Sequence, residues 1–107
     1  MNIYAMGVMQ LDFELRNPIR STRLWELYRR FDDAEETVLL NRGDIFEYYY
    51  NYALIEEVAV VPSRGKYTIP KQQWYYADYY TKDKFSVVVS KVDVPKQFKN
   101  TFCWWVG

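Results

Sequence analysis

Residues 73–92, QWYYADYYTKDKFSVVVSKV, form the stretch that most clearly decides the fold of this 107-residue chain. The first half of the stretch is dense in aromatic side chains and the second half in valine, and both compositions favour β-strands. The polar residues 81–84 lie between the two halves and are few enough to form a turn. The sequence therefore predicts a β-hairpin over this stretch.

A register that pairs Tyr80 with Phe85 assigns every side chain of the hairpin to a face, because side chains alternate along a strand. One face, which we expect to be core, carries Trp74, Tyr76, Asp78, Tyr80, Phe85, Val87 and Val89. The other face, which we expect to be exposed to solvent, carries Tyr75, Ala77, Tyr79, Ser86, Val88 and Ser90. Its mixture of tyrosine, serine and small residues makes it the candidate binding face.

Composition and charge narrow the class of protein. Half of the residues are hydrophobic and 20% are aromatic, which is typical of a folded chain, and the length suits one domain. The formal net charge is zero, so there is no overall electrostatic reason to bind nucleic acid or an anionic membrane. The charge is nevertheless uneven, because residues 1–62 hold an excess of five acids and residues 63–107 an excess of five bases.

The single cysteine and the N-terminal sequence bear on location. Cys103 has no second cysteine with which to form an intramolecular disulfide, which is typical of a reducing compartment. The first fifteen residues lack the basic leader and apolar run of a signal peptide, and acids interrupt the longest apolar runs. We therefore expect a cytoplasmic protein that has no membrane span.

The first forty residues predict one strand region and one helix. Residues 3–15 alternate loosely and suit one strand, or two strands broken at Gly7. Leu24, Leu27, Tyr28 and Phe31 then follow at i, i+3, i+4 and i+7, which predicts a helix over residues 21–31. The acids of residues 32–36 would start a second short helix, or lie in a loop before the apolar residues 37–40.

The middle of the chain leaves two alternatives open. Residues 41–44, NRGD, predict a turn, because Gly43 readily adopts positive φ. For residues 45–57 the tyrosines favour a strand hairpin around that turn with a break near Asn51, and the competing interpretation is a helix from 45 to 57. Residues 62–66 predict another turn, 67–69 a short strand and 101–106 a terminal strand. The expected fold is α+β, a small single domain with an antiparallel sheet of five or six strands and one or two packed helices.

Candidate catalytic and metal-binding residues are scarce. The chain has no histidine, which removes Ser-His-Asp and Cys-His nucleophile systems and the commonest transition-metal ligand. One thiol does not build a structural zinc site, and the acids of residues 32–36 lack the spacing of a calcium loop. We therefore expect no enzymatic activity, no metal and no cofactor.

The high proportion of aromatic residues, 20% of the chain, is the basis of the functional hypothesis. Tyrosine is enriched where proteins bind proteins, so we expect a protein-binding inhibitor or adaptor, such as a phage or mobile-element inhibitor of host defence. The candidate interface residues are Tyr48, Tyr50, Tyr75, Tyr79, Lys82 and Lys84. The alternative is a single-stranded nucleic-acid binder in which these tyrosines stack bases beside Lys66, Lys71, Lys82 and Lys84. A homodimer through residues 101–106 or an open sheet edge would also cover exposed aromatics.

Overall fold

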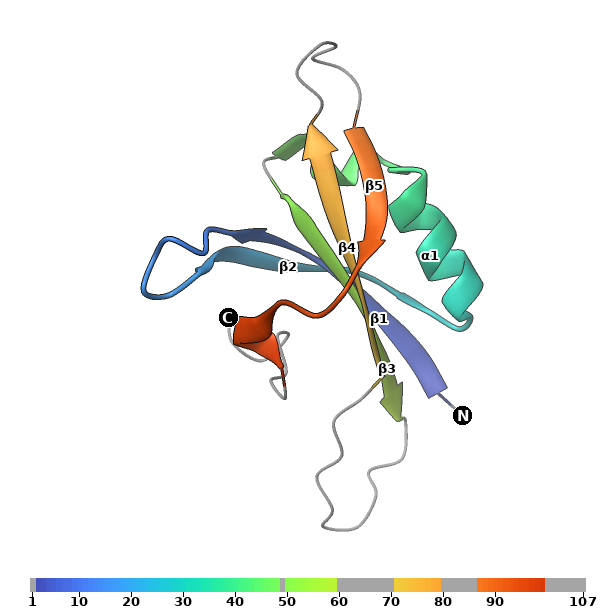
Figure 1. The fold of residues 1–107 in the computed structure, drawn as a ribbon. Coiled ribbons are helices and arrows are strands. Elements are labelled where there is room, and N and C mark those ends of the chain that lie inside the picture. Colours follow the sequence, from blue (N-terminus) through green and yellow to red (C-terminus); the bar gives the residue numbers. More distant parts are fainter. Residues whose placement is uncertain (1, 49, 60–70, 80–86, 100–107) are drawn as a thin grey trace, which may run out of the picture.

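The structure is a computed structural model, and it describes residues 2–48, 50–59, 71–79 and 87–99 (Figure 1). These residues form an antiparallel sheet and one α-helix, which confirms the expected α+β class. The elements, in chain order, are β1 (Asn2–Leu11), β2 (Ile19–Tyr28), α1 (Phe31–Leu39), the 3₁₀ helix η1 (Ile45–Tyr48), β3 (Tyr52–Ala59), β4 (Gln72–Tyr79), β5 (Val87–Val92) and the 3₁₀ helix η2 (Lys96–Phe98). The expected turns and strands at residues 62–66, 67–69, 81–84 and 101–106 lie outside the described residues.

The described strands lie in the order β2-β1-β3-β4-β5, and every neighbouring pair is antiparallel. β1 and β2 form a hairpin at one edge, after which α1 carries the chain across so that β3 pairs with the other side of β1. Figure 1 shows the strands fanning through a large twist from β2 to β5. Among the strands that the structure describes, β2 and β5 therefore lie at the two edges of the sheet.

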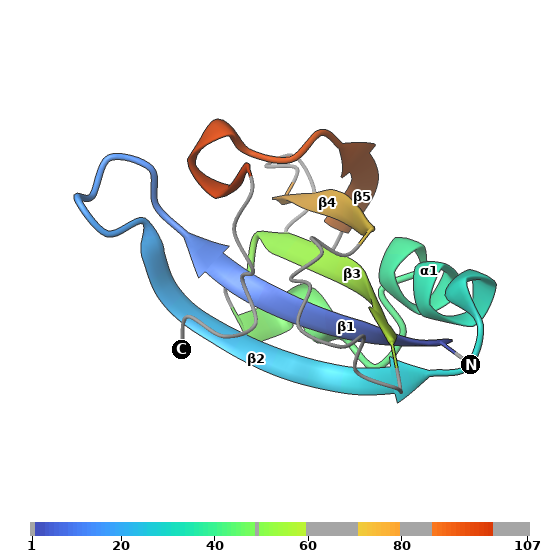
Figure 2. The same cartoon turned by 90° about the horizontal axis from the view of Figure 1, so that it is seen from below.

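Both faces of the sheet are covered, and two separate cores result. On one face, α1 packs over Met6 and Val8 of β1. On the other face, Phe98 of η2 packs with Met9 and Leu11 of the same strand. Figure 2 shows α1 and η2 on opposite sides of the sheet. Strands buried on both faces read as continuous apolar runs, which is why the sequence of β1 alternates only loosely.

The helix predicted over residues 21–31 is wrong, because most of this segment is strand β2. β2 carries two register shifts against β1, opposite Met6/Gly7 and opposite Gln10/Leu11. Each shift inserts one extra residue into β2, so its apolar side chains lose the strict period of two. A bulged strand can therefore show the apolar spacing of a helix. Leu24 and Leu27, which the predicted helix would have buried, are 53% and 54% exposed.

The α-helix α1 begins at Phe31, which confirms the second short helix, and not the loop, as the correct alternative for residues 32–36. Asp32 and Asp33 lie in its first turn, where carboxylates interact favourably with the positive end of the helix dipole. Ala34 and Val38 face the core. The expected turn follows directly, with Asn41, Gly43 and Asp44 all at positive φ.

Residues 45–57 follow neither predicted alternative in full. The break near Asn51 is confirmed, and Tyr52–Ala59 is strand β3. Before the break, however, the chain forms η1 instead of the second strand of a hairpin. Ile45 and Phe46 are fully buried in the core under α1, so burial of two consecutive apolar side chains favours a helical turn over an extended edge strand here.

The hairpin of β4 and β5 is confirmed as a strand pair, but its predicted register is wrong by one residue. Ala77 pairs with Val89 and Tyr79 with Val87, whereas the pairing of Tyr80 with Phe85 would set Tyr76 opposite Val89. A slip of one residue moves every side chain of one strand to the opposite face of the other. Val87 and Val89 therefore share the α1 face with Tyr75 and Ala77.

Candidate functional site

The structure describes the side chains of two of the six predicted interface residues, Tyr50 and Tyr75. Tyr75, expected on the solvent-exposed face, is fully buried, so this expectation was wrong. Tyr50 is half-buried and packs against the core under α1. The side chains of Tyr48 and Tyr79, and both residues Lys82 and Lys84, lie outside what the structure describes.

Tyr75 belongs to a polar network that joins α1 to the sheet. Its hydroxyl donates a hydrogen bond to Oε2 of Glu35, and Nζ of Lys91 lies 3.2 Å from Oε1 of the same carboxylate. Burial, and then the hydrogen bond to Glu35, raise the pKa of Tyr75 well above its ordinary range. The buried hydroxyl is thus satisfied and remains protonated, and the network cross-links α1, β4 and β5.

An exposed aromatic patch occupies the opposite face of the sheet, and we define it as Phe13, Tyr52 and Tyr76. The rings of Tyr52 and Tyr76 are 5.2 Å apart between centroids, and those of Phe13 and Tyr52 are 5.8 Å apart and nearly perpendicular. Phe13 is 37% exposed and Tyr76 38% exposed. Phe13 and Tyr76 are therefore both exposed, and the half-buried ring of Tyr52 lies in contact with each of them.

The aromatic patch rests on a buried aromatic floor. Trp74 is fully buried and stacks on Phe98 of η2 at 5.6 Å with an interplanar angle of 13°. Tyr52 meets Trp74 edge to face at 6.4 Å, and Phe13 lies 6.2 Å from Phe98. Such contacts restrict ring motion, so the exposed rings are held by the sheet and by η2 instead of by loops alone.

Asn51 fixes the position of Tyr52 relative to the β1–β2 hairpin. Its Nδ2 donates to the carbonyl oxygen of Leu11 at 2.9 Å, and its Oδ1 accepts from the backbone N–H of Leu11 at 2.9 Å. Its backbone N–H donates to the carbonyl of Met9, and its carbonyl accepts from the N–H of Ala77. One side chain thus extends the β1–β3 pairing at the point where β3 begins.

The hairpin loop that carries Phe13 is also held by local hydrogen bonds. The backbone N–H of Asp12 donates to the carbonyl of Pro18 at 2.8 Å, and Oδ1 of Asp12 accepts from the N–H of Glu14 at 3.0 Å. A carboxylate that bonds the backbone two residues on is a common way to stabilise a turn. The loop therefore holds Phe13 over the floor.

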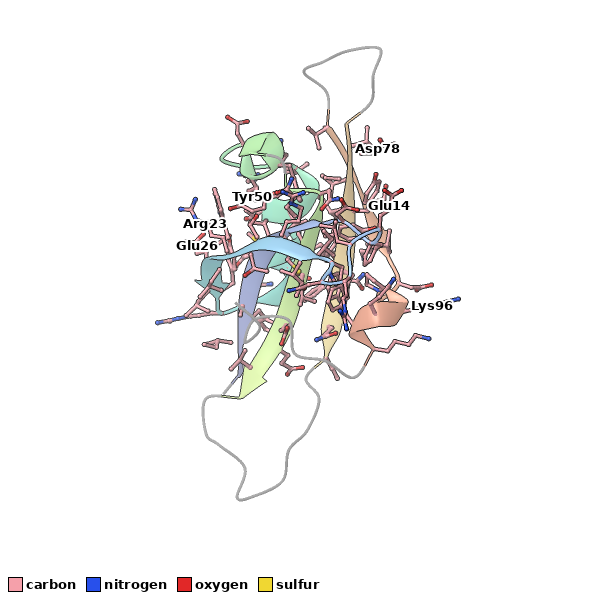
Figure 3. All side chains as sticks on the ribbon, turned by 90° about the vertical axis from the view of Figure 1, so that its left-hand side faces the viewer. Glu14, Arg23, Glu26, Tyr50, Asp78 and Lys96 are labelled. Atoms are coloured by element: carbon pink, nitrogen blue, oxygen red, sulfur yellow. The ribbon has the colours of Figure 1, made fainter. Side chains whose placement is uncertain are left out.

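Charged groups lie beside the patch. Glu14 follows Phe13 in the hairpin loop, and Asp78 is two residues beyond Tyr76 on the same strand face. Figure 3 shows both carboxylates on the same side of the molecule, with Lys96 of η2 below them in the view. Burial, and then the neighbouring Tyr76, raise the pKa of Tyr52, so its hydroxyl is a hydrogen-bond donor at neutral pH.

The aromatic patch differs from the surface that the sequence predicts. Alternation along β4 predicts Tyr76 in the core with Trp74; this face does hold a core, but Tyr76 is 38% exposed at its margin. Phe13 is predicted only as part of the strand region over residues 3–15. The signal that could have found the patch is the pair Trp74–Tyr75, since two adjacent large aromatics in a strand need cores on both faces. Because Trp74 and Tyr75 bury both faces of β4, Tyr76 is the next residue of the strand and the first that lies at the margin of the buried region.

A cavity is a further candidate site among the described residues. A cavity of about 330 Å³ opens beside the start of α1, and its lining residues are Tyr4, Phe31, Ile55, Glu57, Lys71, Gln72 and Gln73. No three Asp, Glu, Cys or His side chains in the described ranges gather as metal ligands would. Within the same ranges, no helix combines the length and apolar character needed to cross a membrane.

Comparison with known proteins gave no relative for this arrangement. No family model, no curated protein and no solved structure matches the chain. The function proposed below is therefore derived from the geometry of the described residues alone.

Proposed function

We propose that this protein is a non-enzymatic protein-binding domain that acts as a stoichiometric inhibitor or adaptor, with the aromatic patch as its contact surface. The observation that carries the proposal is the exposure of Phe13 and Tyr76 above a fully buried floor. Aromatic side chains supply large contact areas at low entropic cost, and binding energy concentrates on such residues when neighbouring packing holds them rigid.

The polar groups of the patch fit a protein partner. Tyr52 and Tyr76 combine an apolar ring with a hydroxyl, which suits an interface where hydrogen bonds surround an apolar centre. Glu14 is adjacent to Phe13 in the chain and Asp78 is two residues beyond Tyr76 on the same strand face, so these two carboxylates, against the single cation Lys96 labelled on the same side in Figure 3, would repel the phosphates of a nucleic acid. The charge around the patch thus favours the protein-binding proposal over the base-stacking alternative.

The test is capture of partners from the native host lysate by the tagged full-length chain, with and without nuclease. The double variant Phe13→Ser/Tyr76→Ser removes the two exposed rings of the patch. The matched control is Leu40→Ser, which removes an apolar side chain that is 59% exposed at the end of α1. We expect a stoichiometric protein partner that resists nuclease, that the double variant loses and that the control retains.

Two outcomes would contradict the proposal. Equal capture by the wild type and by the double variant would show that the partner binds elsewhere. Loss of the partners upon nuclease treatment, with nucleic acid in the untreated eluate, would replace protein binding by nucleic-acid binding. Circular dichroism of both variants checks that neither substitution unfolds the chain.

A further inference from the structure

The outer edge of β2 is a second surface with features of its own. β2 is ten residues long and lies at the end of the sheet, and no strand of the described ranges pairs with its outer side. An edge strand presents a row of unpaired N–H and C=O groups to any extended chain that approaches. Proteins often protect such edges with charged side chains, proline or bulges. β2 contains no proline, and its two bulges leave residues 21–24 and 26–28 in regular pairing with β1, so these two segments present a regular outer side.

The two faces of β2 differ in chemistry. Leu24 and Leu27 lie opposite Gly7 and Ala5, on the face away from α1, and both leucines are more than half exposed. Arg23 and Glu26 lie opposite Val8 and Met6, on the α1 face, and both are exposed. A strand added beside β2 would therefore find apolar side chains on one face and charged side chains on the other.

β2 and the two residues that follow it carry a net positive charge in a protein with no net charge, and Arg30 lies 3.9 Å from Asp32 of α1. Residues 19–30 hold four exposed arginines and one glutamate: Arg20, Arg23, Arg29, Arg30 and Glu26. Arg23 lies over the ring of Trp25, 5.2 Å from its centroid, which holds one guanidinium at the strand. Figure 3 places Arg23 and Glu26 on the opposite side of the view from Glu14, Asp78 and Lys96.

We propose that the outer edge of β2 binds an extended, acidic segment of a partner protein, which joins the sheet as a further strand. Main-chain hydrogen bonds supply affinity in this recognition mode and alternate side chains supply specificity. Acidic side chains of the segment face Arg23 and the neighbouring arginines, and its apolar side chains cover Leu24 and Leu27. This surface is separate from the aromatic patch, so the inference goes beyond the proposed function.

A second copy of the chain fits this edge poorly. In a two-fold antiparallel pairing, the register that sets Arg23 opposite Glu26 of the second copy also sets Arg20 opposite Arg29. Like charges directly opposite one another destabilise a strand pair. An acidic segment avoids the contact between Arg20 and Arg29, and Glu26 is the one acid of β2 that it would meet.

The experiment measures binding of a fluorescein-labelled octapeptide of alternating valine and glutamate to the full-length protein by fluorescence anisotropy. The same peptide with lysine in place of glutamate is the charge control. We expect the acidic peptide to bind, its affinity to fall as salt rises from 50 to 500 mM, and the basic peptide to bind at least about tenfold more weakly. Amide hydrogen exchange of the complex is expected to slow in β2.

Variants test the location of the peptide. Arg20→Glu/Arg23→Glu should weaken binding of the acidic peptide by about tenfold or more, because two attractions become repulsions. The matched control Arg16→Glu reverses an exposed charge in the hairpin loop and should change the affinity by less than about twofold. The aromatic-patch variant Phe13→Ser/Tyr76→Ser should bind the peptide normally, so failure here and failure of the proposed function are distinguishable.

Four results would overturn the inference. Equal affinity for the acidic and basic peptides would remove the charge argument. Slowed exchange outside β2, with β2 unchanged, would place the peptide elsewhere. A concentration-dependent dimer of the free protein in analytical ultracentrifugation that Arg20→Glu/Arg23→Glu abolishes, or tighter binding of a (dT)₁₀ oligonucleotide than of the peptide, would assign the edge to a second copy or to nucleic acid.

Discussion

Tyr75 and Tyr76 are adjacent in the chain and have opposite environments. Tyr75 lies under α1 with no exposed surface, and its hydroxyl is bonded to Glu35. Tyr76 lies on the other face, where it is 38% exposed and contacts Tyr52. The contrast shows that residue type alone does not decide whether an aromatic side chain supports the fold or reaches a partner. The face of the strand decides it, together with how far each core extends.

The largest loss of stability should come from a substitution in the buried aromatic floor, Trp74 and Phe98, beneath the aromatic patch. Trp74→Ala removes a fully buried ring that stacks on Phe98, and we expect it to cost about 3–5 kcal/mol of the free energy of unfolding. Urea unfolding followed by circular dichroism measures this cost. The matched control is Tyr76→Ala, two residues further along β4, which should cost less than about 1 kcal/mol because the ring is partly solvated. Similar costs for the two variants would contradict the assignment of floor and surface.

The next effect concerns the residue that sets the start of β3. Asn51→Ala removes two side-chain hydrogen bonds to the backbone of Leu11, and we expect a loss of about 2 kcal/mol in urea unfolding. Asn17→Ala is the matched control, since Asn17 accepts one hydrogen bond from the N–H of Ile19 at an exposed loop, and it should cost less than about 1 kcal/mol. If Asn51→Ala costs no more than Asn17→Ala, Asn51 does not hold Tyr52 in place.

The smallest stability effect comes from the buried hydroxyl. Tyr75→Phe removes the hydrogen bond to Glu35 and should cost about 1–2 kcal/mol at pH 7, whereas Tyr76→Phe should be nearly neutral. The pKa of Tyr75 is raised above its ordinary value of 10.0 in the folded state. The folded chain therefore binds this proton more tightly than the unfolded chain, so the stabilisation is present below pH 10 and is lost as the pH rises above it.

Urea unfolding between pH 9 and 11 tests the sign of this pH effect. The wild type should lose stability more steeply above pH 10 than Tyr75→Phe does, because the variant lacks the shifted group. Parallel pH profiles for the two proteins would mean that Tyr75 titrates normally and is accessible to water.

Parts of the fold could be predicted from the sequence because local chemistry decides them. The acids before the apolar residues 37–40 indicated the start of α1, and residues 41–44 indicated the turn that ends it. The aromatic and valine-rich halves of residues 73–92 indicated β4 and β5. Each of these features depends on interactions within a few residues of the chain.

The rest could not be predicted, because it depends on pairing between distant strands. Two bulges against β1 gave β2 an apolar spacing that resembles a helix. A register difference of one residue between β4 and β5 moved Val87 and Val89 from the predicted face of Tyr76 to the face of Tyr75. Of the predicted interface residues, Tyr75 is buried in the structure, and the aromatic patch around Tyr76 was not predicted.

The most direct test of the account is hydroxyl-radical footprinting, read residue by residue by tandem mass spectrometry, on the protein alone and with its captured partner. In the free protein we predict oxidation of Phe13 and Tyr76 and protection of Trp74 and Tyr75. In the complex we predict that Phe13 and Tyr76 become protected while Leu40 remains reactive. Oxidation of Tyr75 to the same extent as Tyr76, or a partner that leaves Tyr76 fully reactive, would contradict the account.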